Sequence, residues 1–262
     1  MTAIELNLTG PSWKALATLG MKLSGLSATR RLAAGSRIEG PTAVISVVAP
    51  GAFIDIGAFC NLSGGSINNV RVGRYCSIAA GVVIGPHEHP TDWLTTSRIG
   101  YYPQVNDWDE LMAGADAPAI HARKPHFADS CPITTLGPDV WIGNGAFIKA
   151  GLTIGAGAII GARATVLKDV PPYAVVVGAP GRVLRLRFPD TTVARLLATQ
   201  WWRFSIYDLF DAPFDDIERA LDVIEDMIAS GAVKPFAGRM LTGADLADPL
   251  RRLAPEPLRA AG

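Results

Sequence analysis

Residues 136–167 carry the repeat that decides the fold, and they read LGPDVWIGNGAFIKAGLTIGAGAIIGARATVL. An aliphatic residue returns at every sixth position, namely Leu136, Ile142, Ile148, Ile154, Ile160 and Val166. A compact residue stands two positions before each of the later aliphatics, namely Val140, Ala146, Leu152, Ala158 and Ala164. A period of six matches neither the 3.6-residue period of a helix nor the two-residue alternation of a strand.

A period of six fits a short strand followed by a sharp corner. One inward aliphatic residue fills the interior, and a glycine or another small residue permits the turn. Three such units close one triangular coil of about 18 residues, and coils stack at an interstrand spacing of about 4.8 Å. The sequence therefore predicts a mainly β protein built as a parallel β-helix, with two coils in this stretch.

The same period occurs upstream, at Ile56, Leu62, Val72, Ile78 and Ile84, which predicts about two further coils. The step from Leu62 to Val72 is ten residues, so residues 64–70, GGSINNV, are expected to form a short outward loop. Cys60 and Cys76 fall in the compact inward positions. Cysteine packs there as a small hydrophobic residue, so neither thiol is expected to be a nucleophile.

These repeats resemble the hexapeptide-repeat acyltransferases, and in particular the xenobiotic and surface-saccharide branch, which includes chloramphenicol and streptogramin acetyltransferases. The motifs that carry the resemblance are GRYCSIAAGVVIGPHEHPTDWLTTS at 73–97, the repeats within 135–185, and WWRFSIYDL at 201–209. They cover most of residues 40–210. The resemblance implies a left-handed β-helix, acetyl-CoA as the donor, and a homotrimer with sites between adjacent subunits. The left hand is an exception to the usual crossover rule.

Three regions follow from this interpretation. Residues 1–40 form an N-terminal helical lead-in, residues 41–185 form the β-helix acyltransferase domain with an excursion loop at 86–135, and residues 186–262 form a C-terminal helical cap and tail. The excursion is too long for a passive connector and is expected to carry function.

Helical apolar spacing occurs on both sides of the predicted coils. Residues 12–34 are expected to form the leading helix. Residues 191–204 and 213–230 are expected to form C-terminal helices, with Asp190 and Asp211 as candidate caps. These helices are expected to cover the open end of the β-helix, where unpaired strand edges otherwise invite aggregation.

The four histidines, His87, His89, His121 and His126, all lie in the excursion. Acyl transfer from a thioester to a hydroxyl or amine needs a base for the acceptor's proton, and histidine suits this role near neutral pH. The resemblance assigns the role to His89 in HEHPTDW, with His87 as the alternative. Glu88 departs from the Asn or Gly that the family often has, so either a carboxylate or a backbone carbonyl remains open as the group that orients the ring.

The resemblance also places the donor. Matched motif to motif, the positions that contact acetyl-CoA are Asn144, Ala162, Leu167 and Lys168, with Arg182 at the nucleotide end. The repeat itself demands a small residue at Ala162, whereas the coil requires neither Lys168 nor Arg182.

Aromatic residues follow His89 closely along the chain. Asp92, Trp93 and Tyr101 are expected to bind the acceptor, with the rings as a wall for a sugar or drug-like molecule. Tyr102 and Trp108 belong to the same aromatic run. The alternative, which has at least the same weight, is that these rings anchor the excursion on the β-helix of a neighbouring subunit, and both roles are compatible.

A second function uses the other histidines. His121 and His126 have the HxxxxH spacing of left-handed β-helix carbonic anhydrases, and His87 lies upstream, so a zinc-dependent γ-class-like carbonic anhydrase is the alternative. However, AIHARKPHFAD carries no repeat, whereas the zinc histidines of that family lie on coil strands. The acyltransferase interpretation expects no metal. A non-catalytic scaffold is a third interpretation, and His89 and the donor positions argue against it.

Composition bounds the remaining classes. The 24 Lys and Arg balance the 24 Asp and Glu, which disfavours nucleic-acid and anionic-membrane partners. The 49% of hydrophobic residues excludes general disorder. Three cysteines without a CxxC pair, and no apolar stretch near the roughly 20 residues that span a bilayer, predict a cytoplasmic protein. The acceptor remains open among sugar, nucleotide-sugar and antibiotic, as does O- or N-acetylation.

Overall fold

The computed structural model describes residues 2–127 and 131–252. The chain forms two compact units. The first, called here the coil unit, comprises residues 1–85 and 132–262, and the second, the excursion unit, comprises residues 86–131.

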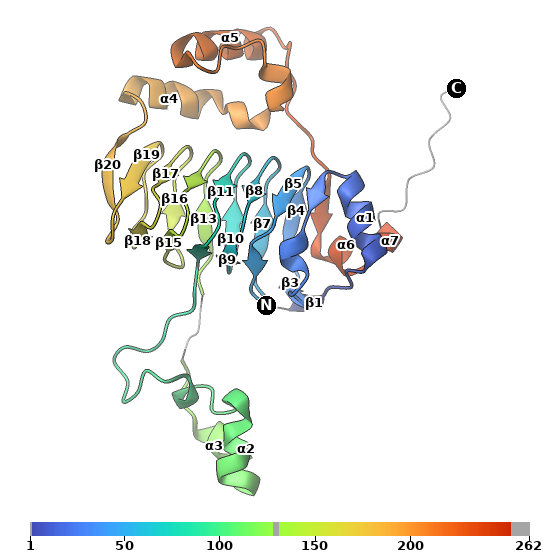
Figure 1. Ribbon diagram of the computed structural model, residues 1–262, viewed down its shortest axis with the longest axis vertical. Helices are drawn as coiled ribbons and strands as arrows, with labels where there is room; N and C mark the ends of the chain where they lie inside the picture. The colour runs from blue at the N-terminus through green and yellow to red at the C-terminus, as the bar shows by residue number, and fades with distance from the viewer. Residues whose placement is uncertain (1, 128–130, 253–262) are drawn as a thin grey trace. The chain divides into compact units, whose positions relative to one another are not determined.

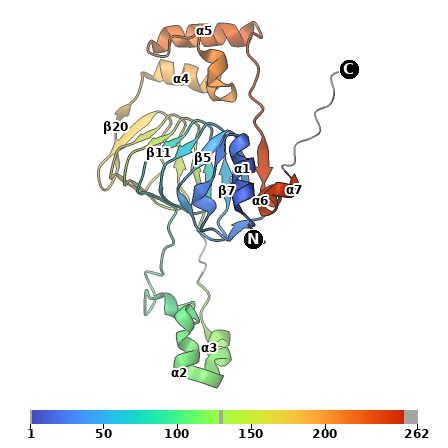
Figure 2. The ribbon, with the colours of Figure 1, turned by 45° about the vertical axis from the view of Figure 1, so that its right-hand side comes forward.

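Three sheets build the coil unit, and their strands stack side by side (Figures 1 and 2). The first sheet has the order β2 (Met21–Lys22), β5 (Thr42–Val44), β8 (Asn61–Leu62), β11 (Ser77–Ile78), β14 (Trp141–Ile142), β17 (Ile159–Ile160), β19 (Ala174–Val177) and β20 (Arg182–Leu186). The second has the order β16 (Thr153–Ile154), β13 (Thr134–Leu136), β10 (Val70–Val72), β7 (Ile54–Ile56), β4 (Arg37–Glu39) and β21 (Met240–Thr242). The third has the order β18 (Thr165–Val166), β15 (Phe147–Ile148), β12 (Val82–Ile84), β9 (Gly65–Ile67) and β6 (Val47–Val48).

From β4 to β18, successive strands enter the second, first and third sheets in rotation. Neighbouring strands in each sheet are parallel, apart from the end strands β20 and β21. Ile142 pairs with Ile160 and Leu136 pairs with Ile154, so one passage through the three sheets takes 18 residues. The predicted period of six is confirmed as three short parallel strands per passage.

The interior of the coil is apolar, as the repeat predicts. Each of the six aliphatic residues from Leu136 to Val166 is at most 2% exposed. Burial of such a side chain contributes about 1.5–3 kcal/mol. Cys60 and Cys76 are buried as expected, and the Cys76 thiol donates to the carbonyl oxygen of Gly137 at 3.1 Å. Burial raises the pKa of the Cys76 thiol, which keeps it protonated and unreactive.

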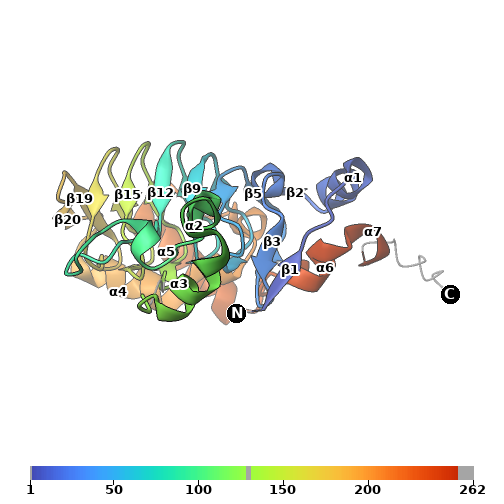
Figure 3. The ribbon, with the colours of Figure 1, turned by 90° about the horizontal axis from the view of Figure 1, so that it is seen from below.

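The expected outward loop at residues 64–70 is wrong. Residues 65–67 form β9, which pairs with β6 and β12, and Figure 3 shows β9, β12 and β15 side by side. The inward aliphatic residues Leu62, Ile67 and Val72 are five residues apart rather than six. A search for a period of six therefore does not detect β9. Gly65 makes this shortcut fit, since its φ is 89° and a Cβ there would lie 2.0 Å from the carbonyl oxygen of Val82.

Helices outside the excursion unit are α1 (Gly10–Thr18), α4 (Asp190–Thr199), α5 (Ile217–Ala229), α6 (Gly243–Ala247) and α7 (Pro249–Arg252). Three short 3₁₀ segments accompany them, η1 (Ser24–Leu26), η5 (Trp201–Arg203) and η6 (Ile206–Leu209). The short strand β1 (Ala3–Glu5) pairs antiparallel with β3 (Arg31–Ala33). Across residues 2–127 and 131–252, every helix is too short or too polar to cross a bilayer.

The leading helix predicted over 12–34 is wrong beyond Thr18, because strands begin earlier than the repeat indicates. Gly20, with a φ of 70°, turns the chain from α1 into β2, and β4 already belongs to the second sheet. Leu16 of α1 and Leu246 of α6 pack on the core of the coil. Since β2 and β21 are the end strands here, α1 and α6 cover this end of the core.

The predicted position of the helices over 191–204 and 213–230 at an open end of the coil is wrong. The segment after α4 binds a corner of successive coils: the Tyr75 hydroxyl donates to the carbonyl oxygen of Phe204 at 2.7 Å, and Arg74 donates to that of Arg203 at 3.0 Å. On the same corner, Arg187 donates to Asp139 at 2.9 Å. The side chains of Arg74, Tyr75 and Asp139 at this corner therefore bind the segments that flank α4. The first sheet ends instead with β20, which pairs antiparallel with β19.

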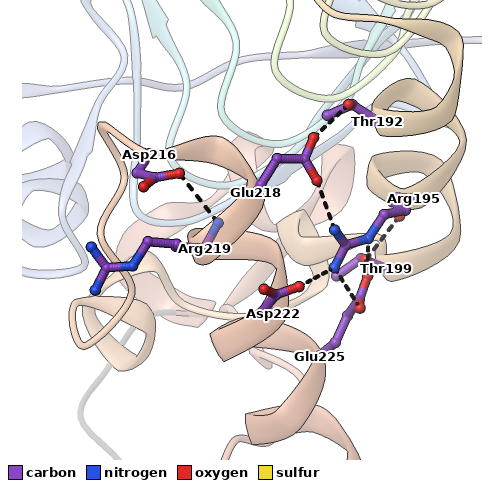
Figure 4. A network of polar contacts seen from close by, with 8 residues as sticks. All are labelled: Thr192, Arg195, Thr199, Asp216, Glu218, Arg219, Asp222 and Glu225. Carbon is purple, nitrogen blue, oxygen red and sulfur yellow. Dashed lines mark hydrogen bonds and ion pairs between the residues drawn. The ribbon is translucent and has the colours of Figure 1, made fainter.

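Arg195 joins α4 to α5. Its guanidinium donates to the carboxylates of Glu218, Asp222 and Glu225 at 2.7–2.9 Å (Figure 4). The predicted caps differ from those observed, because Asp190 is the first helical residue of α4 rather than its cap. Asp216, not Asp211, caps α5, its side chain accepting from the Arg219 N–H at 3.3 Å.

We expect Gly157→Ala to lower the free energy of unfolding by about 2 kcal/mol. Gly157 has a φ of 67°, and a Cβ there would lie 2.3 Å from the buried ring of Tyr173. Gly231→Ala is the matched control, since Gly231 has a φ of 71° with no atom near an added Cβ. Urea denaturation of both variants measures the effect, and equal losses would contradict the steric argument.

Candidate functional site

His89 lies in the exposed segment that opens the excursion unit. Its Nδ1 lies 2.7 Å from the carbonyl oxygen of Thr96. A carbonyl oxygen only accepts, so in the neutral imidazole Nδ1 carries the proton and Nε2 carries the lone pair. The group that orients the ring is therefore a backbone carbonyl, and the tautomer is the one that a general base with a reactive Nε2 needs.

Aromatic rings gather beside His89. The rings of His89 and Tyr101 are 6.1 Å apart, and the Tyr101 hydroxyl lies 3.5 Å from Nδ1. Phe127 contacts both predicted rings, at 4.8 Å from Tyr101 and 5.6 Å from Trp93. The structure thus brings Trp93 and Tyr101 together near His89, while Asp92 is exposed outside these ring contacts.

Phe127 was missed in the sequence because it stands far from HPTDW along the chain. Its one signal is that it is the only phenylalanine among residues 86–131. Trp108, which the aromatic run included, begins α2 (Trp108–Ala113) and is half-exposed.

The other histidines take different positions. His121 on α3 (Ala117–Arg123) contacts the buried carboxylate of Asp109 on α2 through Nε2. Within residues 2–127 and 131–252, no group of three His, Cys, Asp or Glu side chains could hold a metal ion. Within this one chain, the described residues thus do not bring His87, His121 and His126 together as a single metal site.

A pocket of about 300 Å³ opens within the excursion unit. Its lining combines aromatic and basic side chains, namely Arg98, Tyr101, Tyr102, His121, Lys124, Pro125, His126 and Phe127. Besides the helices α2 and α3, the excursion unit contains three short 3₁₀ segments, η2 (Arg98–Gly100), η3 (Val105–Asp107) and η4 (Gly114–Asp116). Tyr101 is shared between this pocket and the surroundings of His89.

The predicted donor residues lie on the surface of the coil unit. Asn144 and Ala162 occupy equivalent corners, after β14 and β17, and the Asn144 side chain donates to the carbonyl oxygen of Ala80 at 2.6 Å. The Gly181 N–H donates to the carbonyl oxygen of Thr165 at 2.7 Å, which brings the start of β20 against β18.

Leu167 and Lys168 follow β18 at the next corner, and Arg182 begins β20. All five predicted donor side chains, Asn144, Ala162, Leu167, Lys168 and Arg182, are exposed. Leu167 is an apolar side chain that is 47% exposed. Such a side chain gains stability from a ligand that covers it.

A cavity of about 430 Å³ lies between α4, α5 and the corner of the coil. Its lining is mostly apolar, with Tyr173, Arg187 and Asp139 at the coil side. It contains none of the residues that the sequence assigned to donor, acceptor or catalysis.

Comparison with known proteins supports the repeat. The model of the family described as bacterial transferase hexapeptide (six repeats) matches residues 133–168. The chloramphenicol acetyltransferase of Agrobacterium fabrum is 39% identical over 134 residues, spanning 50% of this chain and 58% of that protein. The chain thus covers less than two thirds of this relative. A solved hexapeptide-repeat acetyltransferase from Vibrio cholerae aligns over 70% of this chain and 80% of its own, at 20% identity and a TM-score of 0.41.

A further relative matches over more of its length. The probable macrolide acetyltransferase of Lysinibacillus sphaericus is 34% identical over 142 residues, spanning 53% of this chain and 72% of that protein. The similarity to this acetyltransferase and the 18 residues per passage through the three sheets lead to the same family. The chain belongs to the hexapeptide-repeat acyltransferases.

Proposed function

We propose that this protein is an acetyl-CoA-dependent acetyltransferase that transfers an acetyl group to a hydroxyl or amine of a small acceptor, with His89 as the general base. The observation that carries the proposal is the 2.7 Å contact between Nδ1 of His89 and the carbonyl oxygen of Thr96. The family to which the chain belongs supports the chemistry and a left-handed coil. The named relatives, a chloramphenicol acetyltransferase and a probable macrolide acetyltransferase, support an antibiotic acceptor, and a sugar or nucleotide-sugar acceptor is proposed beside it from the family resemblance.

The proposed reaction is direct attack. Nε2 of His89 takes the proton from the acceptor's hydroxyl or amine as that atom bonds to the acetyl carbonyl carbon. A backbone N–H stabilises the oxyanion that forms. The intermediate then collapses, the carbon–sulfur bond breaks, and the departing thiolate takes the proton back from His89. No thiol nucleophile is required, which suits the buried state of Cys60 and Cys76.

Five exposed residues form the proposed donor site. Lys168 and Arg182 supply positive charge for the phosphates of acetyl-CoA. Leu167 offers an apolar surface to the pantetheine arm, and Asn144 and Ala162 stand at corners where the backbone is accessible. Trp93 and Tyr101, with Asp92 nearby in sequence, form the proposed acceptor site.

Thiol release tests the proposal. The full chain is incubated with acetyl-CoA and a panel of sugars, nucleotide-sugars and antibiotics, and free CoA is measured. We expect release that depends on one acceptor class and produces an acetylated product. If no acceptor stimulates release although acetyl-CoA binds, the proposal is wrong. Stoichiometric zinc that is lost in His121→Ala, together with CO₂ hydration, would favour the carbonic anhydrase alternative.

We also propose a homotrimer in which each site takes His89 from one subunit and Lys168 from another. Mixing His89→Ala chains with Lys168→Ala chains is then expected to restore about a quarter of the wild-type activity, because random trimers contain that share of undamaged sites. Each variant alone is the control. A mixture that stays as inactive as its components, although light scattering shows mixed trimers, would contradict the shared site.

A further inference from the structure

The pocket of the excursion unit concentrates positive charge. Among the described residues of its lining, Arg98 and Lys124 are cations, His121 and His126 are imidazoles, and none is a carboxylate, although the Asp109 carboxylate contacts His121 from outside this lining. The surrounding segment has the opposite bias, since residues 86–131 contain more Asp and Glu than Lys and Arg. The described lining is therefore locally more basic than the segment around it, and this local charge favours an anion.

Tyr102 holds the two cations at the pocket. The Arg98 guanidinium lies 4.8 Å from the centroid of the Tyr102 ring, and Nζ of Lys124 lies 5.8 Å from it. Cation–π contacts restrict both side chains, so less conformational entropy is lost when a ligand binds them. Arg98 offers a planar fork of donors, which matches the oxygen atoms of a phosphate or carboxylate.

Tyr101 connects this pocket to the proposed base. Its side chain lines the pocket, and its hydroxyl lies 3.5 Å from Nδ1 of His89. The pocket and His89 therefore share one side chain, that of Tyr101, which reaches the imidazole on its Nδ1 side.

We propose that the acceptor carries an anionic group, a phosphate or a carboxylate, and that Arg98 and Lys124 bind this group while its hydroxyl or amine faces His89. This inference rests on the proposed function, to which it adds the substrate class. It selects phosphorylated or acidic sugars over neutral acceptors.

Binding tests the pocket without catalysis. Wild-type protein is saturated with CoA, so that phosphate sites for the donor are filled, and is titrated calorimetrically with glucose 6-phosphate, glucuronate and methyl glucoside. We expect the two anions to bind at least tenfold more tightly than the neutral sugar. Preference for the phosphate or for the carboxylate identifies the group. Equal binding of all three, or none, would overturn the inference.

Matched variants locate the site. Arg98→Gln and Lys124→Gln are each expected to weaken anion binding about tenfold. Arg123→Gln is the control, because Arg123 is exposed on α3, donates to the carbonyl oxygen of Ala119 at 3.2 Å and lies outside the lining. An equal loss in Arg123→Gln would show a general charge effect and overturn the assignment.

Kinetics separates this inference from the proposed function. Arg98→Gln is expected to raise KM about tenfold for an anionic acceptor, whereas Arg123→Gln, which lies outside the lining, is expected to leave KM and kcat within about twofold. Turnover of neutral acceptors only, without anion binding, would overturn the anion pocket and leave the acetyltransferase in place. Anion binding that needs Arg98 and Lys124, without thiol release from any acceptor, would overturn the proposed function and leave the pocket.

Discussion

Replacing His89 with alanine is expected to lower turnover by a factor of about 10² to 10⁴, the usual contribution of a general base. The variant loses the Nε2 lone pair that receives the acceptor's proton. It also loses the ring that the carbonyl oxygen of Thr96 orients. The affinity for acetyl-CoA is expected to change little, because the proposed donor residues lie on the coil. Steady-state thiol release with a good acceptor gives kcat, and calorimetry gives the donor affinity.

His87→Ala is the matched control for this variant. His87 stands two positions away, is exposed, and was the alternative base in the sequence. A general base at His89 predicts that His87→Ala keeps most of its turnover. If His89→Ala retained near-normal turnover, or if His87→Ala lost as much, the assignment of the base would be wrong.

The sequence could name His89 but not the atom that orients it. HEHPTDW marks the histidine by motif, whereas its partner is a backbone carbonyl, which any residue at position 96 supplies. Arg98 and Lys124 likewise look like ordinary surface cations until the chain brings them onto one tyrosine ring. Contacts made by backbone atoms, or between residues far apart in sequence, leave no local pattern to read.

The fold was readable where its spacing stays regular. From Leu136 to Val166 the period of six predicts each strand and each buried aliphatic residue. It fails at β9, where steps of five residues replace six, and at α1, where Gly20 ends the helical segment early. The C-terminal helices were predicted as elements but were placed at the wrong part of the coil, because Tyr75 and Arg74 bind the segment after α4 through side chains that the repeat does not constrain.

Glu39→Ala is expected to lower the free energy of unfolding by about 3 kcal/mol, because it removes one partner of a largely buried ion pair. Glu39 is 7% exposed, and its two oxygens accept from Arg74 at 2.6 and 2.8 Å. One oxygen also accepts from the Ala58 N–H at 3.1 Å. Arg74 donates further to the carbonyl oxygen of Phe236 at 3.0 Å, so the pair joins β4 to the segment after α5.

Arg37→Ala is the control for this loss. Arg37 and Asp55 form a pair at 2.6 Å as well, but the Arg37 side chain is 53% exposed. Solvent screens such a pair, so Arg37→Ala is expected to cost less than about 1 kcal/mol. Urea denaturation at pH 7 measures both variants, and equal costs would mean that burial does not strengthen the Glu39–Arg74 pair.

The Glu39–Arg74 pair makes the free energy of unfolding fall at acidic pH. Burial by itself would raise the pKa of Glu39, but the hydrogen bonds from Arg74 and from the Ala58 N–H outweigh it and lower the pKa below its ordinary value of 4.5. The folded state therefore favours the carboxylate, and the stability that this gives is present above pH 4.5 and is lost as the pH falls through the lowered pKa. The difference in unfolding free energy between wild type and Glu39→Gln, followed from neutral pH downward, is expected to shrink below pH 4.5. A difference that stays constant through this range would show that Glu39 does not exchange its proton with folding, and the depressed pKa would then be wrong.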